Sequence, residues 1–344
     1  MEKVSLGRTN LMVGRTSFGA LPIQRISKED AGYLLRKAYD NGINYFDTAR
    51  MYSDSEEKIG YGLSHVRENI VISTKSHGTT GKELLEHIDI SLRNLKTDYV
   101  DILQLHNPSF LPMPGDGSGL YEALLKAREM GKTRFIGITN HQLKISKDAV
   151  LSGLYDTVQF PLSSISSQED LSLIDLCKKH NIGLIAMKGL SGGLITNAAS
   201  TFTFLRQYEN VVPIWGIQRE WELDEFISLE ANPPKMDQEM QEIIEKDRKE
   251  LSGSFCRGCG YCMPCPVEIP ISTAARMSYM LDRSPIEPYM TVDWRGKMDR
   301  INDCIECGQC KSKCPYELDT PNLLKRMLQS YNITYENYVK NMSK

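Results

Sequence analysis

The chain of 344 residues is poor in cysteine over most of its length and lacks several features that mark particular classes of protein. Residues 1–255 contain a single cysteine, Cys177, which we expect to be a packed structural residue. No stretch reaches the roughly 20 apolar residues that a membrane-spanning helix requires, and the start, MEKVSLGRTN, has no apolar signal core. A net charge of −3 gives no basis for binding nucleic acid or an anionic membrane. We therefore expect a cytoplasmic protein with reduced thiols.

The other eight cysteines lie between residues 256 and 314, in two runs that each end in Cys-Pro. The second run has the C-x₂-C-x₂-C-x₃-C-P spacing, which resembles the runs that hold [4Fe–4S] clusters in bacterial-type ferredoxins. The first run is one residue shorter before its last cysteine. In two-cluster ferredoxins the fourth cysteine of each run crosses to the other cluster, so the resemblance implies two ligand sets. These sets are Cys256, Cys259, Cys262 and Cys314, and Cys304, Cys307, Cys310 and Cys265.

Two other interpretations of the cysteines are weaker. Zinc ribbons usually set two C-x₂-C pairs well apart, whereas these runs are contiguous triplets. A disulfide framework belongs to small secreted chains. The role of two clusters stays open. They either stabilise a small module that could not fold alone or pass electrons between the body of the chain and an external donor such as ferredoxin.

The body of the chain alternates short apolar runs with longer amphipathic segments. Segments 27–42, 81–96 and 119–132 repeat apolar residues at three- and four-residue intervals, as helices do, and Ser27 is placed to cap the first. The short runs, which we interpret as strands, are RTSFGAL, NYFDTA, IVISTK, VDILQLH, RFIGITN, DTVQFP, GLIAMK and VVPIWGI. Alternating strands and helices favour a parallel sheet, and eight units match a closed (β/α)₈ barrel. No G-x-G-x-x-G motif opens the first helix, as a Rossmann domain would require.

These patterns predict three parts. Residues 1–232 form a (β/α)₈ TIM barrel, residues 233–254 a helical linker that begins at two prolines, and residues 255–344 a small ferredoxin-like α/β iron–sulfur domain with a C-terminal helix. A chain of this length, with 41% hydrophobic residues, can bury one large core and carry such a module.

Four residues with acid–base chemistry follow strands of the predicted barrel. Asp47 ends NYFD, Lys75 ends IVISTK, His106 ends ILQLH, and Tyr52 lies five residues after Asp47. Each alone has a structural explanation, such as a helix cap or a packed side chain. In a parallel barrel, however, the functional side chains gather at the carboxyl ends of the strands. Together the four residues predict an acid–base site.

The chain resembles the aldo-keto reductases over about residues 4–230, because FDTARMYSDSEEKIG, IVISTK, DILQLH, FIGITN and VQFP match that family's motifs in order. The resemblance implies reduction of a carbonyl by NADPH or NADH. Tyr52 would donate the proton, although a free tyrosine titrates near pH ~10. Lys75 would stabilise its phenolate, Asp47 would hold Lys75 charged, and His106 would orient the substrate carbonyl.

The same resemblance implies which residues hold the nucleotide. Thr139, Asn140 and Gln159 match positions that bind the nicotinamide carboxamide, and Met187 stands where many members stack a tyrosine. The glycine-rich run after the seventh strand is expected to bring backbone N–H groups to the pyrophosphate. The full set of expected contacts is Gly19, Ala20, Thr139, Asn140, Gln159, Met187, Lys188, Gly189, Leu190, Gly192, Gly193, Gly216 and Arg219.

After the eighth strand the chain departs from the family's pattern. Family members usually carry a Lys or Arg that binds the 2′-phosphate and an Asn that binds the adenine. At these places the present chain has Gly216, Glu222 and Phe226, and Arg219 is the cation that it offers to the phosphate. The choice between NADPH and NADH therefore stays open.

Three functions remain in competition. The first is a carbonyl reductase acting on a small molecule. The second is an electron-transfer oxidoreductase whose clusters exchange electrons with an external donor. The third is a non-catalytic nicotinamide-binding sensor or scaffold, which the complete set of four acid–base residues disfavours.

Overall fold

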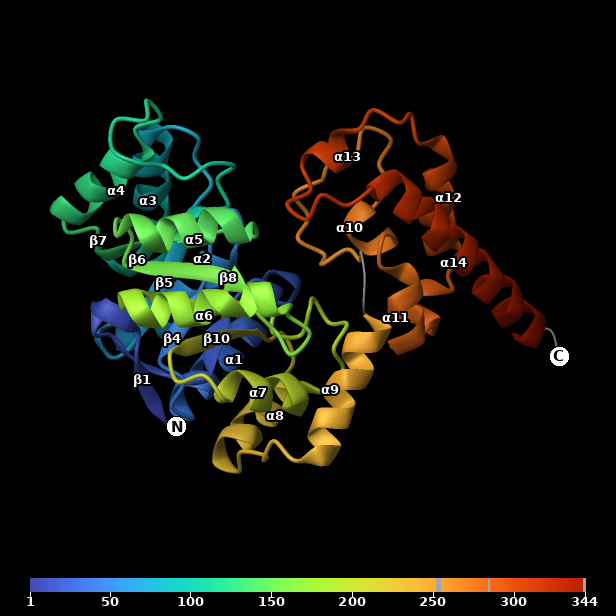
Figure 1. The fold of residues 1–344 in the computed structure, drawn as a ribbon, viewed down its shortest axis with the longest axis horizontal. Helices are drawn as coiled ribbons and strands as arrows, with labels where there is room; N and C mark the ends of the chain where they lie inside the picture. The colour runs from blue at the N-terminus through green and yellow to red at the C-terminus, as the bar shows by residue number, and fades with distance from the viewer. Residues whose placement is uncertain (252–254, 284, 343–344) are drawn as a thin grey trace. The chain divides into compact units, whose positions relative to one another are not determined.

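The computed structural model describes residues 1–251, 255–283 and 285–342. The chain folds into two compact units, which are described separately (Figure 1). The first consists of Met1–Gly189 and Asn197–Ile244, and the second of Leu190–Thr196 and Glu245–Lys344. No helix in the described part of the chain is long and apolar enough to cross a membrane.

The first unit is a closed barrel of parallel strands in the order β10-β3-β4-β5-β6-β7-β8-β9, in which β9 and β10 pair to close the ring. The strands are β3 (Ser17–Gly19), β4 (Tyr45–Asp47), β5 (Val71–Ser76), β6 (Val100–His106), β7 (Thr133–Thr139), β8 (Thr157–Pro161), β9 (Gly183–Met187) and β10 (Val211–Gly216). Each coincides with one of the eight apolar runs, although β5 and β7 extend one residue beyond theirs, so the predicted (β/α)₈ fold is confirmed.

An antiparallel hairpin that was not predicted from the sequence precedes the barrel. Its strands are β1 (Lys3–Ser5) and β2 (Met12–Gly14). Leu6 and Val13 share a buried cluster with Val71, the first residue of β5. The turn comes so close to β9 that a Cβ on Gly7, whose φ is +53°, would lie 2.3 Å from the backbone nitrogen of Gly183. Glycine is therefore required there. The hairpin packs at the end where the strands begin.

Helices alternate with the strands, and α5 and α6 lie outside β8 (Figure 1). The helices of this unit are α1 (Lys28–Asp40), α2 (Ser55–Leu63), α3 (Gly81–Leu95), α4 (Leu120–Glu129), α5 (Leu143–Ser152), α6 (Gln168–His180), α7 (Ala198–Arg206) and α8 (Glu220–Ala231). The predicted cap of α1 is confirmed, because the Ser27 hydroxyl accepts the N–H of Asp30 at 3.0 Å. Cys177 is buried in α6, and burial raises its pKa to about 12, as suits a structural thiol.

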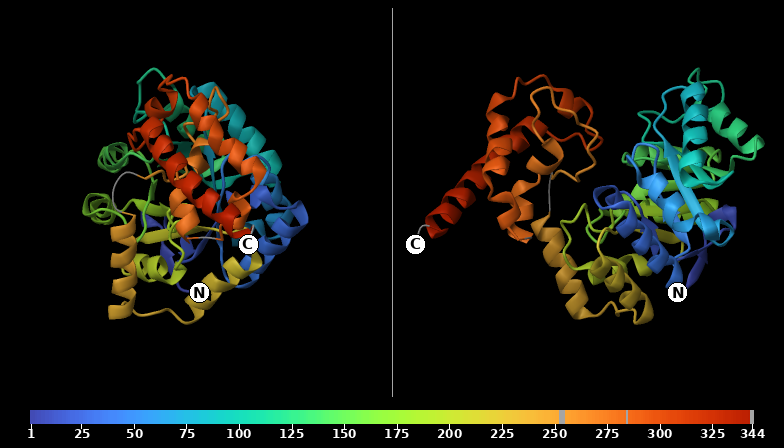
Figure 2. Two further views of the ribbon diagram at one scale, coloured as in Figure 1. Left: turned by 90° about the vertical axis from the view of Figure 1, so that its right-hand side faces the viewer. Right: turned by 180° about the vertical axis from the view of Figure 1, so that it is seen from behind.

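The second unit is built from helices and turns around the cysteine runs. The chain reaches it through α9, which spans Gln238–Glu250 and so begins later than the two prolines, Pro233 and Pro234, where the helical linker was expected to begin. It contains α10 (Ile271–Ala274), α11 (Met277–Arg283), α12 (Val292–Asp299), α13 (Gln309–Ser312) and α14 (Thr320–Met342). Figure 2 shows α14 as one continuous helix in both views. Its core includes Met277, Met298 and Tyr331.

The second unit has no β-strand among its described residues, which differs from the α/β module expected. The backbone beside the cysteines explains the difference. Gly258, Gly260, Glu306 and Gly308 all have positive φ, and such turns interrupt the extended conformation that a strand needs. The predicted boundaries at residues 232 and 254 stay a prediction.

Candidate active site and iron–sulfur module

The four predicted acid–base residues come together at the ends of three neighbouring strands. Asp47 is the last residue of β4 and His106 the last of β6, while Lys75 lies one residue before the end of β5. The strand register sets how far along the barrel axis each side chain lies. Asp47 of β4 pairs with Ser73 of β5, and Lys75 of β5 pairs with Gln104 of β6. Tyr52 comes from the loop that connects β4 to α2.

Lys75 and Asp47 form a buried ion pair. Lys75 Nζ lies 2.6 Å from Asp47 Oδ2 and 2.6 Å from the carbonyl oxygen of Thr48. The side chains are 1% and 3% exposed, so water contributes little to their solvation. Burial lowers the pKa of Lys75, and the charge of Asp47 opposes this effect. The ammonium form of Lys75 therefore depends on Asp47.

The loop that carries Tyr52 is fixed at several points. The N–H of Arg50 donates to the carbonyl of Lys75 at 3.0 Å, and the N–H of Tyr52 donates to the carbonyl of Ala49 at 3.0 Å. The guanidinium of Arg50 also pairs with the buried carboxylate of Glu56. These contacts place the half-buried Tyr52 ring beside the rest of the site.

Tyr52 is in contact with both His106 and Lys75. The rings of Tyr52 and His106 meet edge to face with centroids 5.7 Å apart. Lys75 Nζ lies 5.3 Å from the centre of the Tyr52 ring. Burial lowers the pKa of His106 well below its usual value, and the charges of Lys75, His77 and Lys188 lower it further. A neutral imidazole at this position can donate one N–H to a substrate oxygen.

Three further residues of the site were missed from the sequence. The hydroxyl of Ser73 donates to Asp47 Oδ1 at 2.6 Å and lies 2.9 Å from the hydroxyl of Tyr45. Because Ser73 uses its proton on Asp47, Tyr45 donates to Ser73. Gln104 Nε2 lies 3.5 Å from Asp47 Oδ1. Tyr45, Ser73 and Gln104 each precede a predicted residue by two positions, and this strand periodicity was the signal that could have found them.

Gln159, Thr139 and Met187 form the part of the site expected to meet the nicotinamide. Gln104 Nε2 donates to Gln159 Oε1 at 2.9 Å, so the Nε2 group of Gln159 is left as the donor. Gln159 Nε2 and Thr139 Oγ1 lie 3.7 and 3.8 Å from Met187 Sδ. A thioether is a weak acceptor. An amide with such a weak partner fits a carboxamide ligand.

Asn140 is already used within the protein. Its Nδ2 group donates to the carbonyl of Pro108 at 2.8 Å, and its Oδ1 accepts the N–H of Gln142 at 2.8 Å. A primary amide has a second N–H and a second lone pair. Asn140 can therefore contact a ligand while it holds these two loops.

The remaining expected contacts of the first unit lie near the ends of β3, β9 and β10. Gly19 and Gly216 end their strands, and the N–H of Ala20 donates to the carbonyl of Asp47 at 2.8 Å. A Cβ on Gly189 would lie 2.5 Å from the Trp215 ring, so glycine is required for this packing. Lys188, between β9 and Gly189, has a φ of +57°.

Arg219, the expected cation, is mostly exposed at the start of α8. Its guanidinium lies 3.9 Å from Glu222 and 5.9 Å from the Trp221 ring. An exposed guanidinium can reach a phosphate, but the nearby carboxylate competes for it. The geometry of Arg219 therefore favours neither NADPH nor NADH.

Leu190, Gly192 and Gly193, the other expected contacts, belong to the second unit. Ser191, Gly192 and Gly193 have φ values of +49°, +72° and +91°. The N–H of Gly193 already donates to the carbonyl of Leu190 at 2.8 Å, so this group is used within the turn.

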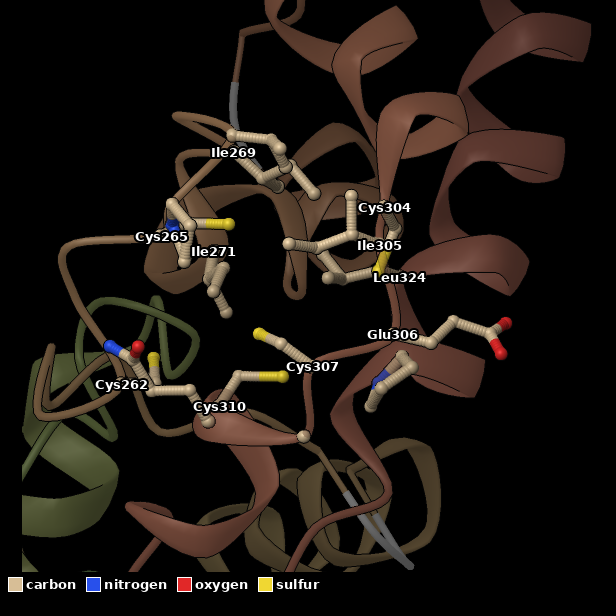
Figure 3. Close-up of a pocket in the computed structure, with 15 residues that line it drawn as sticks. Cys262, Cys265, Ile269, Ile271, Cys304, Ile305, Glu306, Cys307, Cys310 and Leu324 are labelled. Carbon is tan, nitrogen blue, oxygen red and sulfur yellow. The ribbon is translucent and has the colours of Figure 1, made fainter.

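The cysteines surround two cavities in the second unit. The first cavity is lined by Cys256, Cys259, Cys262 and Cys314. The second cavity is lined by Cys265, Cys304, Cys307 and Cys310, together with Cys262. Figure 3 shows the second cavity, with Ile269, Ile271 and Leu324 at its wall. The structure thus gathers each implied ligand set around its own space.

The cavities fit clusters better than single metal ions. All nine cysteines are described, and all are free thiols. Among the described residues, no three His, Cys, Asp or Glu side chains converge closely enough to hold one ion. Burial raises the pKa of Cys256, and that of Cys262 to about 12. Bound iron would supply the positive charge that makes these thiols thiolates.

Comparison with known proteins assigns both units. The model of the Aldo/keto reductase family matches residues 10–203, and that of a 4Fe-4S dicluster domain matches residues 255–319. L-galactose dehydrogenase from Arabidopsis thaliana is 33% identical over 215 residues, which cover 57% of this chain and 67% of that protein. The uncharacterized oxidoreductase YqkF from Bacillus subtilis is 28% identical over 212 residues, with coverage of 57% and 67%.

Solved structures show the same barrel. The holo form of aldo-keto reductase AKR11C1 from Bacillus halodurans superposes with a TM-score of 0.64 at 18% identity, covering 72% of this chain and 96% of its own. An aldo-keto reductase from Klebsiella pneumoniae in complex with NADPH superposes with a TM-score of 0.62 at 20% identity, covering 71% and 94%.

The parallel barrel, with acid–base residues at the carboxyl ends of its strands, is that of an oxidoreductase. The chain belongs to the aldo-keto reductase family, and its C-terminal region carries a 4Fe-4S dicluster domain.

Proposed function

We propose that this protein reduces the carbonyl group of a small molecule to an alcohol, with NADPH or NADH as hydride donor. The observation that carries the proposal is the buried Lys75–Asp47 pair beside Tyr52. Burial of a lysine ammonium costs desolvation free energy. A buried, charged lysine therefore supports a site whose reaction uses that charge. The relative named L-galactose dehydrogenase and the structure with NADPH support the same class of reaction.

Each residue has a distinct part in the proposed reaction. The N–H of His106 holds the carbonyl oxygen of the substrate, and Tyr52 transfers a proton to this oxygen. Lys75 stabilises the phenolate that Tyr52 becomes, and Asp47 keeps Lys75 protonated. Gln159 and Asn140 would hold the nicotinamide, which when bound supplies the hydride. Leu21, Met51 and Phe110 are exposed apolar side chains that we place around the substrate.

Removal of the Tyr52 hydroxyl tests this proposal. Tyr52→Phe should lower the turnover of aldehydes by about 10²–10⁴-fold, because it removes the acid. The affinity for NADPH, measured by fluorescence titration, should stay close to that of the unchanged protein. Tyr33→Phe is a matched control, since the Tyr33 hydroxyl is exposed and donates to Glu220. Retained turnover in Tyr52→Phe would show that another group is the acid.

The exposure of the second cysteine run supports a second candidate function, electron exchange with an external donor such as a ferredoxin. Cys307 is exposed, and the neighbouring Ile305 is 63% exposed. A cluster near the surface of its unit could be reached by a protein donor. Each cluster takes one electron, whereas hydride transfer moves two, so a mediator such as a flavin would be required.

Anaerobic addition of NADPH, and then NADH, to the protein as purified separates the two candidates. Reduction of the clusters, monitored by EPR and by absorbance near ~400 nm, would show that the two units exchange electrons. Oxidised clusters together with nucleotide binding would favour simple carbonyl reduction.

A further inference from the structure

The segment Leu190–Thr196 follows β9 in the sequence but folds as part of the second unit. It is a tight turn, in which the N–H groups of Gly193 and Ile195 both donate to the carbonyl of Leu190, at 2.8 and 3.2 Å. The segment contains three of the residues expected to meet the nucleotide. Its conformation is therefore set by contacts within the unit that contains the cysteines.

Arg276 provides a contact of this kind. Its Nη1 group donates to the carbonyl of Gly192 at 2.7 Å, and its Nε group donates to the carbonyl of Ser272 at 2.9 Å. Hydrogen bonds from a charged donor are stronger than neutral ones. The planar guanidinium thus connects the turn to α10, which contains Ser272.

Two glycines allow this close approach. A Cβ on Gly192 would lie 3.0 Å from Arg276 Nη1 and 3.2 Å from the carbonyl oxygen of Arg257. A Cβ on Gly258 would lie 2.8 Å from the guanidinium carbon of Arg276. Both glycines have positive φ, at +72° and +62°. Arg276 is therefore packed between the turn and the first cysteine run.

The same residues contact a proposed cluster ligand. The N–H of Gly258 points to Cys256 Sγ at 3.4 Å, and the carbonyl of Ser272 lies 4.0 Å from this sulfur. Cys256 lines the first cavity. A continuous set of contacts therefore leads from the first cavity, through Ser272, Gly258 and Arg276, to Gly192.

We propose that Arg276 makes the order of the segment Leu190–Thr196 depend on the first cluster. When iron binds Cys256, Cys259 and Cys262, Arg276 packs against the turn at Gly258 and the start of α10. Without iron this run loses the bonds that fold it, since ligands and fold of such modules form together. Arg276 then loses its support, and the segment is released. The inference rests on the proposed ligand sets and does not depend on carbonyl reduction.

Hydrogen exchange of the full-length, cluster-loaded protein, measured by mass spectrometry, tests the inference. The peptide that covers Leu190–Thr196 should exchange about tenfold faster in Arg276→Lys, because lysine cannot make both bonds and the loss of a charged hydrogen bond gives a factor of this size. Cys259→Ser should release the segment in the same way and lower the iron content. Cys310→Ser should lower the iron content and leave the segment unchanged.

Two other variants keep the experiment decisive. Gly192→Ala disturbs the contact by adding a Cβ in the turn. It should release the segment while the protein keeps its full iron content. Arg295→Lys is the matched control, because Arg295 donates to Asp299 in α12 and to Asn332 in α14. Its exchange should match that of the unchanged protein.

Each outcome decides a separate point. Unchanged exchange in both Arg276→Lys and Gly192→Ala would overturn the role of Arg276. Faster exchange in these variants but not in iron-depleted Cys259→Ser would overturn the dependence on the cluster. Full iron content in Cys259→Ser would overturn the ligand set. Failure of carbonyl reduction in the unchanged protein would contradict the proposed function and leave the exchange result valid.

Discussion

In the barrel, Asp47 and Lys75 are fixed by strand register and hydrogen bonds, whereas the cysteines of the second unit project from turns around two cavities. The buried charges of the barrel site are paired within the protein. Asp47 accepts from Lys75, Ser73 and Gln104, so its charge is satisfied without a ligand.

At the functional centre of the second unit the hydrogen bonds are weaker, as in the 3.4 Å approach of the Gly258 N–H to Cys256 Sγ. Its described turns adopt positive φ at six residues within three positions of a cysteine, and its cysteines are free thiols. We infer that the barrel can hold its site before any ligand binds, while the second unit depends on its metal to fix the cysteines. Experiments on each unit test this difference.

Removal of iron should have the largest effect and should act on one unit. Chelation under reducing conditions should expose residues 245–344 to protease more than about a hundredfold faster, since a loss of ~3 kcal/mol of folding free energy already gives this factor. The barrel fragment should stay resistant. Mass spectrometry of the fragments measures both. Equal protection of residues 245–344 with and without iron would show that this unit folds on its helices alone.

Loss of the buried ion pair should have the next largest effect, in the barrel. Lys75→Met leaves the carboxylate of Asp47 buried and unpaired, which should destabilise the barrel by about 3–5 kcal/mol. The turnover should also fall by about 10²–10⁴-fold. Combining Lys75→Met with Asp47→Asn should restore most of the stability, measured by urea unfolding, but none of the turnover. Recovery of turnover in the double variant would contradict the role of Lys75.

The fold of the barrel was largely predictable because its signal repeats. Eight apolar runs alternate with amphipathic segments, and a strand forms at each run. The hairpin of β1 and β2 was missed because its two short strands stand outside this repeat, before the first strand–helix unit. Its presence depends on packing against the barrel, which a local pattern does not contain.

The candidate sites were predictable to different degrees. Asp47, Lys75 and His106 stand at strand ends, where the fold itself indicates function. Tyr45, Ser73 and Gln104 lie one strand period deeper, and their hydrogen bonds required the strand register. The contact of Arg276 with Gly192 joins residues 84 positions apart and follows no periodic pattern.

Gln104 should affect nucleotide affinity more than proton transfer. Gln104→Leu removes the donor that fixes the amide of Gln159, so that Gln159 can present either its oxygen or its nitrogen to the ligand. The affinity for NADPH should fall by about tenfold, as expected for the loss of one hydrogen bond to a buried amide. Fluorescence titration measures this, and kcat should change less than KM. A larger fall in kcat would mean that Gln104 acts mainly through Asp47.

Acidification provides the smallest expected effect. Burial lowers the pKa of His106 in the folded state, so the unfolded chain takes up a proton near pH ~6.5 that the native site does not. The stability associated with neutral His106 is therefore present above about pH 6.5 and is lost as the pH falls toward the lower folded-state pKa. His106→Gln should lose less stability between pH ~8 and ~5.5 than the unchanged protein.

Urea unfolding of the barrel at the two pH values, followed by tryptophan fluorescence, measures this difference. His180→Gln is the control, since His180 lies exposed at the end of α6 and should leave the acid sensitivity unchanged. The effect should be modest because one proton at one buried ring is involved, whereas loss of iron removes the bonds that hold two whole cysteine runs. Equal acid sensitivity in His106→Gln and the unchanged protein would show that folding does not lower the pKa of His106, so that the buried ring would take up a proton near pH ~6.5.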